Sequence, residues 1–360
     1  MKITIVGGGN IGTQFAVHCS QKNDVIVFTS KPETFCETVS IVDENGNEVL
    51  ESKKIKATNN QDEAFLSADL IFITYPAPFM ENISKKLCKY SKPGLKIGLV
   101  PGTGGGECAF KDLIKSGVTV FGLQRVPSVA RLVERGKAVR AVGYRNELFV
   151  ASLPGNEACF IADTIQDIFG IKCTPLPNYL SVTLTPSNPI LHTARLKTVF
   201  KDYKCGVKYS SLPLFYEDWD DESGELLFKC DAEVQNICKA LCSRGFDVSG
   251  VKSLKEHYES DTPSALTNKI RSIKGFKGLT SPAIKSDDKY IPDFNARYFS
   301  ADFPYGLNVL IQIGDFLGID IENMKETMDW YRKVSGNTSE FSYKKYGINN
   351  LSDFLDFYSK

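Results

Sequence analysis

The first half of the chain alternates short apolar runs with longer amphipathic stretches. Residues 11–21 have helical spacing, and the runs that favour β-strands lie at residues 2–6, 25–29, 70–74, 97–100 and 118–121. Strands that are apolar throughout and joined by helices are typical of a parallel sheet covered on both faces. We therefore expect an α/β fold that begins with a doubly wound sheet, which forms a first domain over residues 1–180.

A turn signal interrupts this alternation after the second predicted strand. Asn45-Gly46 is the strongest short-range hairpin signal, and strand-like residues 38–42 and 48–57 flank it. We expect an inserted hairpin that lies at the edge of the sheet and is exposed to solvent.

After about residue 180 the apolar residues take the helical period, and strand signals nearly disappear. A cluster of prolines, Pro175, Pro177 and Pro186, marks the change. Helical spacing covers residues 189–200, 226–242, 264–273, 305–317 and 321–334. The pattern predicts a mainly α-helical C-terminal domain over residues 181–360, which we expect to hold the substrate and the catalytic groups.

Charge and composition narrow the range of partners. The 360 residues carry 43 basic and 43 acidic side chains, so there is no excess of Lys and Arg for nucleic acid. No apolar run approaches the roughly 18 residues of a membrane-spanning helix, so we expect no membrane contact and a cytoplasmic location. The ten cysteines and three histidines lack metal-ligand spacing, which predicts reduced thiols and no bound metal.

A glycine-rich turn directly follows the first predicted strand and opens the first helix. Gly7, Gly9 and Gly12 match the GxGxxG pattern, and Asn10 and Ile11 complete the loop. Gly7 permits the tight turn, Gly9 lets backbone approach a pyrophosphate, and the helix N-terminus attracts the anion. In this context the motif predicts a dinucleotide site rather than a plain glycine-rich turn. Residues 1–180 are therefore expected to form an NAD(P)-binding Rossmann domain.

The end of the second predicted strand indicates which dinucleotide binds. NAD-binding domains place an acidic residue there, on the ribose 2′-hydroxyl, whereas this chain has Thr29, Ser30 and Lys31. Hydroxyls and a lysine suit a 2′-phosphate better than a diol, so we expect NADP, with Ser30 and Lys31 among its ligands. A solvated Lys31 and the use of NAD are the alternative.

A second glycine-rich segment, residues 99–106, ends a later strand. It contains Pro101 and Gly102, and its backbone amides are free to approach a ligand if the loop is open. We expect Pro101 and Gly102 to line the nicotinamide side of the cofactor. The alternative is a flexible loop without a ligand.

Three segments of the second half sharpen this outline. They are Ser187-Asn188-Pro189-Ile190-Leu191-His192, then Tyr216-Glu217 with Asp231-Ala232-Glu233, and then residues 297–307, Arg-Tyr-Phe-Ser-Ala-Asp-Phe-Pro-Tyr-Gly-Leu. In this order, after a Rossmann domain, they resemble the octopine/nopaline (opine) dehydrogenase family, and the resemblance spans essentially the whole chain. That family condenses the amino group of an amino acid with a 2-oxo acid and reduces the product with NADH or NADPH.

The resemblance implies roles for four residues. His192 matches the catalytic histidine, Asp302 its carboxylate partner, and Arg297 the arginine that holds a substrate carboxylate. Asn188 lies where the family keeps an asparagine near the histidine. The resemblance also implies an NAD(P)-dependent dehydrogenase acting on CH–NH bonds, with an amino acid or amine and a 2-oxo acid as its small-molecule partners.

Elementary chemistry supports these residue types. Forming and reducing an imine needs a proton donor and acceptor near neutral pH, where an ordinary imidazole titrates. We place His192 in the opening turn of a helix capped by Ser187 or Asn188, where the helix dipole disfavours an imidazolium and a buried Asp302 would counter this. Arg297 suits a carboxylate because its planar fork offers two parallel donors.

The spacing of these residues makes a further prediction. Arg297 and Asp302 are five positions apart, so a regular helix would turn them about 140° away from each other. A loop or kink between them is needed if both are to face one site. The alternative interpretations are a core histidine held by local hydrogen bonds and an ordinary surface arginine.

Two positions depart from the family pattern. Thr193 follows the histidine where the family usually has proline, and residues 124–128, Gln-Arg-Val-Pro-Ser, replace a Glu-Thr found after the Rossmann domain. The second departure leaves the amine substrate open. Arg125, Arg131 and Arg195 either add carboxylate contacts or are structural or exposed.

Two other kinds of function are compatible with the sequence. Ketopantoate reductases and glycerol-3-phosphate dehydrogenases share the two-domain plan and reduce a ketone without an amine, but they generally use a lysine where this chain offers His192 and Asp302. A non-catalytic dinucleotide sensor would need neither residue. The long helices of the second half could form a homodimer as easily as pack internally.

Overall fold

The computed structural model describes residues 1–359 and divides them into two compact units, Met1–Thr183 and Leu184–Ser359. The sequence analysis placed the division at residue 180. Lys360, which ends the predicted C-terminal domain, lies outside the described residues. Each unit is described by itself.

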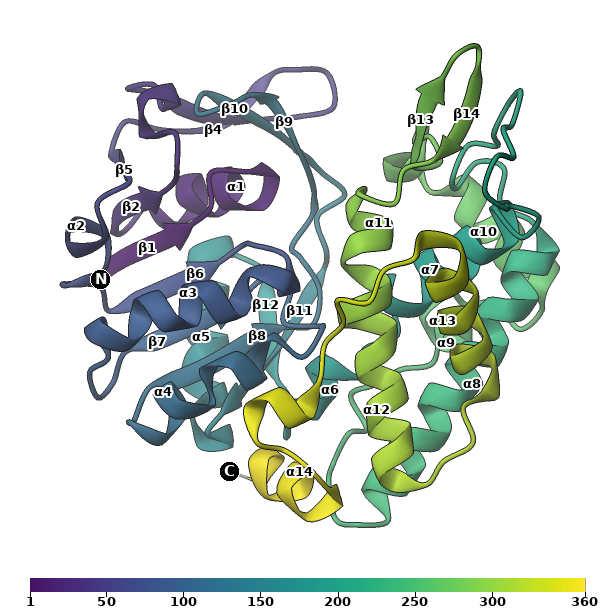
Figure 1. The fold of residues 1–360 in the computed structure, drawn as a ribbon. Coiled ribbons are helices and arrows are strands. Elements are labelled where there is room, and N and C mark those ends of the chain that lie inside the picture. The colour runs from purple at the N-terminus through teal and green to yellow at the C-terminus, as the bar shows by residue number, and fades with distance from the viewer. Residues whose placement is uncertain (360) are drawn as a thin grey trace. The chain divides into compact units, whose positions relative to one another are not determined.

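The first unit is built on an eight-stranded sheet with the order β12-β11-β8-β7-β6-β1-β2-β5 (Figure 1). Its strands are β1 (Lys2–Val6), β2 (Asp24–Phe28), β5 (Ile55–Thr58), β6 (Leu70–Ile73), β7 (Lys96–Leu99), β8 (Thr119–Leu123), β11 (Glu147–Leu153) and β12 (Lys172–Pro175). All the strands predicted from apolar runs are present. β1 pairs with β2 on one side and β6 on the other, so the strand order reverses beside β1, where doubly wound sheets bind their ligands.

The sheet is mixed, which corrects the expectation of a purely parallel one. The strands from β5 to β8 in the sheet order run parallel, whereas β11 pairs antiparallel with β8, and β12 pairs parallel with β11. The chain between β8 and β11 passes through two strands of another sheet and contains no helix. An antiparallel neighbour needs no helical crossover, so β11 can pair directly with β8.

Helices cover both faces of the large sheet, as a doubly wound fold requires. Ile3 and Ile5 of β1 pack with residues of α1 and α5, whereas Thr4 points to the opposite face and its hydroxyl donates to the backbone of α2 at Ala64. The helices of this unit are α1 (Asn10–Cys19), α2 (Gln61–Phe65), α3 (Met80–Leu87), α4 (Lys111–Lys115), α5 (Ala158–Phe169) and α6 (Leu180–Thr183).

The predicted hairpin forms, but it is not an exposed ornament at the sheet edge. It belongs to a four-stranded sheet with the order β4-β3-β10-β9. These strands are β3 (Val39–Val42), β4 (Glu48–Ser52), β9 (Val129–Glu134) and β10 (Ala138–Val142). All of β3 is buried, and Val39 and Ile41 pack with Val17 of α1. The strands that bury the hairpin come much later in the chain, so no local signal could reveal them.

The second unit is mainly helical, as the spacing of its apolar residues predicts. Its helices are α7 (Asn188–Val199), α8 (Asp221–Cys242), α9 (Leu254–Tyr258), α10 (Pro263–Ser272), α11 (Arg297–Ser300), α12 (Asn308–Leu317), α13 (Glu322–Ser335) and α14 (Leu351–Tyr358). A short hairpin, β13 (Ala283–Ser286) with β14 (Lys289–Pro292), extends from these helices in Figure 1. The sequence analysis missed it because both strands are short and mostly exposed, without an alternating apolar pattern.

Two buried carboxylates of α8 hold the beginnings of other helices. Asp231 accepts the backbone N–H of Leu254 at the start of α9 (2.8 Å). Glu233 accepts the backbone N–H groups of Asn323 and Met324 at the start of α13 (2.7 and 2.9 Å). Helix N-termini carry unpaired N–H groups and a partial positive charge, both of which a carboxylate satisfies. This family-like segment of α8 therefore has a structural task.

Three observations concern membranes, metals and thiols. Within residues 1–359, no helix is both long and apolar enough to cross a membrane. No group of three or more His, Cys, Asp or Glu side chains in this range is arranged to hold a metal ion. The cysteines are free thiols, and half of them are buried.

Candidate active site

The glycine-rich turn lies at the carboxyl end of β1, beside the point where the strand order reverses. Gly7 has a φ of +112°, and a Cβ there would lie 2.7 Å from Thr74 Oγ1. A Cβ on Gly12 would lie 1.7 Å from the carbonyl oxygen of Gly7, so only glycine lets α1 approach the turn this closely. Gly7 and Gly12 thus have the conformational tasks that the motif predicts.

The same turn leaves space and backbone donors for a dinucleotide. A Cβ on Gly9 would meet nothing within 4 Å, and α1 begins after Gly9 with no side chain capping its first N–H groups. Uncapped N–H groups at a helix N-terminus attract an anion such as a pyrophosphate. The residues of the loop therefore fit the cofactor that the motif predicts.

The side chains of Asn10 and Ile11 contact other parts of the protein. Asn10 Oδ1 accepts the backbone N–H of Leu132 in β9 (2.8 Å), which ties the start of α1 to the small sheet. Ile11 packs against the apolar clusters of both sheets. Both residues can therefore serve a ligand through their backbone rather than through their side chains.

Arg135 lies at the loop and was not identified from the sequence. It sits between β9 and β10, and its Nη1 donates to the carbonyl oxygen of Gly8 (3.4 Å). The adjacent Gly136 is pressed against the chain after β2, because a Cβ there would lie 2.1 Å from the carbonyl oxygen of Thr34. The pairing of β10 with β3 creates this contact, and no local pattern announces it.

Ser30 and Lys31 are exposed just beyond the carboxyl end of β2. The backbone N–H of Lys31 donates to Oγ1 of the buried Thr29 (3.3 Å). Among residues 1–359 the ammonium group of Lys31 has no hydrogen-bond or ion-pair partner. An exposed cation therefore stands where the sequence analysis places the ribose 2′ position, and its role stays a prediction.

Gly102 departs from the expectation of an amide that is free for a ligand. Its N–H donates to the carbonyl oxygen of Leu123 (2.9 Å), and a Cβ there would lie 2.6 Å from the Cα of Gly122. The hydroxyl of Tyr179 donates to the Gly102 carbonyl (3.4 Å). Gly102 is thus required for close packing between neighbouring chain segments. Pro101 is half-buried and follows a cis peptide bond, and its place beside the nicotinamide stays a prediction.

His192 and Asp302 meet in the interior of the second unit. His192 Nδ1 lies 2.7 Å from Asp302 Oδ2, and the two side chains are 4% and 13% exposed. Because the carboxylate accepts the Nδ1–H, Nε2 is the nitrogen that can exchange a proton. The residues are 110 positions apart, and the fold brings together the pair that we selected from the sequence.

The helix places His192 farther from its terminus than we expected. α7 begins at Asn188, and its N-cap residue Ser187 makes no side-chain capping bond. His192 is the fifth residue of the helix, beyond the first turn, where the effect of the helix dipole has largely faded. Asp302 is therefore the dominant charge on the imidazole. The half-buried Asn188 lies one turn before His192 on the same helix.

A π-helical turn supplies the predicted break between Arg297 and Asp302. α11 ends at Ser300, and the π-turn Asp302–Leu307 follows it. Pro304 lies within this turn and has no N–H to donate, so a regular α-helix cannot continue through it. α11 thus ends before Asp302, and a site shared by Arg297 and Asp302 stays a prediction.

Arg297 is exposed at the first position of α11. Its guanidinium makes no hydrogen bond or ion pair with any other residue of the described range. It does not join the pair formed by His192 and Asp302, and its donors are available to an anion. Binding of a carboxylate by Arg297 stays a prediction.

Tyr216 is the residue of this site whose role the sequence did not indicate. Its hydroxyl lies 2.7 Å from His192 Nε2, and the side chain is buried. The ring of Tyr298 covers the imidazole at a centroid distance of 4.2 Å. Burial and the nearby Tyr298 raise the pKa of Tyr216 well above its usual range, so its hydroxyl stays protonated. Its place in the Tyr216-Glu217 segment was the only sequence signal.

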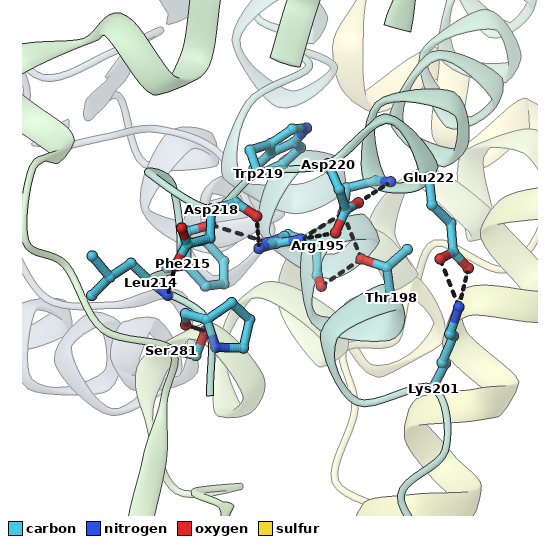
Figure 2. A network of polar contacts seen from close by, with 12 residues as sticks. Arg195, Thr198, Lys201, Leu214, Phe215, Asp218, Trp219, Asp220, Glu222 and Ser281 are labelled. Carbon is cyan, nitrogen blue, oxygen red and sulfur yellow. Dashed lines mark hydrogen bonds and ion pairs between the residues drawn. The ribbon is translucent and has the colours of Figure 1, made fainter. Parts of the chain in front are cut away.

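Arg195 is structural, as Figure 2 shows. Its guanidinium donates to the carbonyl oxygens of Phe215 (3.0 Å) and Asp218 (2.6 Å) and to the carboxylate of Asp220 (2.6 Å). Arg195 is completely buried and lies one turn after His192 on α7. It therefore fixes residues 215–220, which include Tyr216, against the helix that carries His192. Arg131, by contrast, is exposed, and within residues 1–359 its guanidinium donates only to the neighbouring carbonyl of Ala130.

Comparison with known proteins shows which enzymes this chain is similar to. Residues 175–335 match the alpha-helical domain of NAD/NADP octopine/nopaline dehydrogenase, and residues 2–102 match the N-terminus of NAD-dependent glycerol-3-phosphate dehydrogenase. Tauropine dehydrogenase of Arabella iricolor is 27% identical over 98% of this chain and 99% of its own length. Octopine dehydrogenase of Mizuhopecten yessoensis is 25% identical over 93% and 90%. The second unit thus matches the alpha-helical domain of the octopine/nopaline dehydrogenase family, and the whole chain is similar to tauropine and octopine dehydrogenases.

Solved structures share the fold of this chain. Octopine dehydrogenase with NADH and L-arginine, and the same enzyme with NADH and pyruvate, each superpose with a TM-score of 0.84 at 22% identity. Each match covers 99% of this chain and 98% of the other. The common fold therefore includes both units.

Similarity to the opine dehydrogenases over both units confirms several expectations. The chain is a dehydrogenase of the class that acts on CH–NH bonds, it depends on NAD or NADP, and it combines a Rossmann domain with a helical domain. The match of the second unit to the family's helical domain disfavours the ketone-reductase and sensor alternatives.

Proposed function

We propose that this chain condenses the amino group of an amino acid, or another amine, with the carbonyl carbon of a 2-oxo acid and reduces the resulting imine with NAD(P)H. The observation that carries the proposal is the buried contact of 2.7 Å between His192 Nδ1 and Asp302 Oδ2, in a chain similar to the opine dehydrogenases. Both the condensation and the reduction move a proton near neutral pH, which suits an imidazole held by a carboxylate.

In the condensing direction His192 acts as the proton donor. Its imidazolium gives the Nε2 proton to the hydroxyl group that leaves as water when the imine forms, and the neutral ring keeps its Nδ1–H on Asp302. The bound nicotinamide supplies the hydride that reduces the imine carbon. In the opposite direction the neutral Nε2 accepts a proton, so Asp302 serves both directions by holding one tautomer and stabilising the positive charge.

Arg297 and Asn188 position the substrate in this proposal. The guanidinium of Arg297 is exposed and unpaired within the described residues, and its planar fork matches the two oxygens of a carboxylate. Both substrates of the proposed reaction can carry a carboxylate. Asn188 lies one helical turn before His192 and offers an amide to a polar group held beside the imidazole.

An amine-dependence assay tests the reaction. Oxidation of NADPH is measured with pyruvate alone and with pyruvate plus each member of a panel of amino acids, including taurine and L-arginine. We expect oxidation to require the amine and a secondary amine product to appear by mass spectrometry. Oxidation at the same rate without any amine would contradict the proposal and favour a simple ketone reductase.

We propose further that NADP is preferred over NAD. Lys31 offers an exposed ammonium group, Ser30 a hydroxyl, and no carboxylate ends β2. A phosphate bound by a lysine contributes a charge-assisted hydrogen bond, so Lys31→Ala should raise the Kd for NADPH about tenfold or more and leave the Kd for NADH unchanged. Lys22→Ala, at the other end of α1, is the matched control. Equal losses for both dinucleotides would contradict the assignment of Lys31.

We also propose a cytoplasmic location for the reaction. The free cysteines suit a reducing compartment, where thiols persist. Fractionation of cells that express the chain tests this, and recovery with a membrane or secreted fraction would contradict it.

A further inference from the structure

The nitrogen of His192 that should face a substrate is already paired with a protein hydroxyl. Asp302 occupies Nδ1 and Tyr216 occupies Nε2, each at 2.7 Å. The imidazole is therefore held from both sides inside the second unit. A ring fixed in this way cannot rotate, which is a property that proton transfer to a bound substrate needs.

The surroundings of Tyr216 fix its hydroxyl in place. Its ring stacks on Phe276, with centroids 4.0 Å apart and planes 16° apart, and meets the edge of Phe215 at 4.8 Å. Arg195 holds the backbone on both sides through the carbonyls of Phe215 and Asp218 (Figure 2). Burying the charge of Arg195 costs solvation free energy. The loop that Arg195 holds carries Tyr216, the hydrogen-bond partner of His192.

We propose that Tyr216 is a positioning residue, whose hydroxyl holds the imidazole of His192 at Nε2 and keeps this nitrogen paired in both protonation states until a substrate reaches it. This proposal rests on the proposed function, because Tyr216 affects the reaction only through the proton transfer assigned to His192. Tyr216 is not the acid or base itself.

The chemistry of a hydroxyl explains why tyrosine suits this position. The hydroxyl donates to a neutral Nε2 and accepts from a protonated Nε2–H, so one side chain serves both states of the ring. Phenylalanine does neither. Because a bond to a charged donor is roughly twice as strong as a neutral one, removing the hydroxyl disfavours the imidazolium more than the neutral ring. The imidazolium would then also be buried without a partner on one side.

The groups that face the imidazole come from three elements. Asp302 belongs to the π-turn, Tyr216 to the segment before α8, and Tyr298 to α11. Tyr258 of α9 acts on Tyr216 from farther away. Within residues 1–359, no hydrogen bond, ion pair or ring contact reaches His192 from α8 or α13, which also pack against α7. Asp302 is thus the charge that favours the imidazolium, and the hydroxyl of Tyr216 is its only other polar partner there.

The first test compares pH profiles of turnover for the full-length enzyme. Tyr216→Phe should displace the histidine-dependent limb to lower pH by about one unit in both reaction directions. It should also lower kcat in the condensing direction at neutral pH and leave the KM for NADPH unchanged. Tyr209→Phe is the matched control, because its buried hydroxyl has no hydrogen-bond partner among the described residues, and its profile should equal that of the wild type.

The second test needs no turnover and therefore separates this inference from the proposed function. The chain has only three histidines, so the ring signals of His192 can be followed by NMR against pH, with those of His18 and His257 as internal references. In Tyr216→Phe the titration midpoint of the His192 signals should move to lower pH by about one unit, and the other two should not move.

The outcomes separate the possibilities. A displaced profile together with a displaced NMR midpoint supports the positioning role. A uniform loss of activity at every pH with an unchanged NMR midpoint would show that Tyr216 is merely structural and would overturn it, as would a variant that behaves like the wild type. Absence of amine-dependent turnover in the wild type would refute the proposed function instead, and the NMR comparison would still decide the role of Tyr216.

Discussion

At the scale of single residues, the order Asp302, His192, Tyr216 defines the chemistry of the second unit. The carboxylate fixes Nδ1–H, the imidazole is almost fully buried, and a neutral hydroxyl meets Nε2. Burial strengthens each of these contacts, because water does not compete for them. His18 shows the opposite case, since burial without a charged partner lowers its pKa to about 4 and keeps it neutral. A partner of opposite charge is what distinguishes a catalytic candidate from a core histidine here.

His192→Asn should remove the proton carrier and leave the rest of the site intact. Asparagine keeps a polar side chain of similar reach but does not titrate. We expect kcat to fall by about 10²- to 10⁴-fold, which is the usual contribution of general acid and base groups. Steady-state kinetics measures this loss, and fluorescence titration measures the affinity for NADPH, which should be unchanged. His257→Asn is the control. Retention of most activity in His192→Asn would contradict the assigned role.

Some residues of the site could be predicted from the sequence, and others could not. His192 and Asp302 were found because they lie in motif-like segments with an arginine and an asparagine nearby. Tyr216 lay in such a segment too, but its sequence neighbours did not show that its hydroxyl contacts Nε2 of His192. Arg195 was left open between a substrate contact and a structural task, and only its buried partners decide this.

At the scale of elements, the site depends on how α7 is joined to its neighbours. The π-turn brings Asp302 to one side of His192, and residues 215–220 bring Tyr216 to the other. Arg195 links the second of these segments to α7. The precision of the site therefore comes from a helix, a broken helix and an anchored loop, rather than from any one of them.

Arg195→Met should destabilise the second unit strongly. The substitution keeps the length of the side chain but leaves the carbonyls of Phe215 and Asp218 buried without this donor. We expect the free energy of unfolding to fall by about 1–3 kcal/mol, the usual cost of leaving a buried acceptor such as the Phe215 carbonyl without its donor. Urea unfolding followed by tryptophan fluorescence measures it. The control Arg244→Met, at an exposed arginine on the surface, should change stability by less than about 0.5 kcal/mol.

The contact of Asp231 with the start of α9 should make the stability of the second unit depend on pH. Burial raises the pKa of Asp231 to about 6 from its usual 3.8. Because the folded state holds this proton where the unfolded chain has lost it, the contribution of Asp231 to stability is greatest below about pH 4 and declines as the pH rises through 6.

Asp231→Asn tests this sign. The amide oxygen can still accept the N–H of Leu254, and the charge never forms. The stability of the variant relative to the wild type should therefore increase by about 2 kcal/mol between pH 4 and pH 7. Urea unfolding at both pH values measures the difference. A difference that does not vary with pH would contradict the raised pKa.

At the scale of the whole molecule, the chain is two compact units with separate interiors. The first has a helix enclosed by two sheets, with α1 packing on the large sheet through Phe15 and Ala16 and on the small one through Val17. The second contains the long helix α8, whose carboxylates Asp231 and Glu233 accept backbone N–H groups at the starts of α9 and α13. The glycine-rich turn lies in the first unit, and the pair formed by His192 and Asp302 lies in the second.

The tryptophans allow the two units to be followed separately. Both tryptophans of the chain, Trp219 and Trp330, lie in the second unit, whereas the glycine loop lies in the first. NADPH at 100 times its Kd should stabilise the first unit by about 2.7 kcal/mol. In urea, the transition seen by circular dichroism should therefore shift to higher concentration more than the transition seen by tryptophan fluorescence. Equal shifts would show that the units unfold together.

The sequence by itself determined the class of each half and the candidates for its chemistry. Apolar strands after which a glycine turn opens a helix define a dinucleotide domain, because those residues satisfy requirements that are local in the chain. The spacing of Arg297 and Asp302 even required the break that the π-turn provides.

Only the tertiary structure decided what depends on contacts between distant segments. β3 is buried because β10 pairs with it, whereas β4 stays at the edge of the small sheet and is mostly exposed. The amide of Gly102 donates to Leu123 and is therefore not available to a ligand. Tyr216 reaches Nε2 of His192 because Arg195 anchors its loop. Burial and hydrogen-bond partners are set by packing in three dimensions, and a residue's chemistry follows from them rather than from its neighbours in the chain.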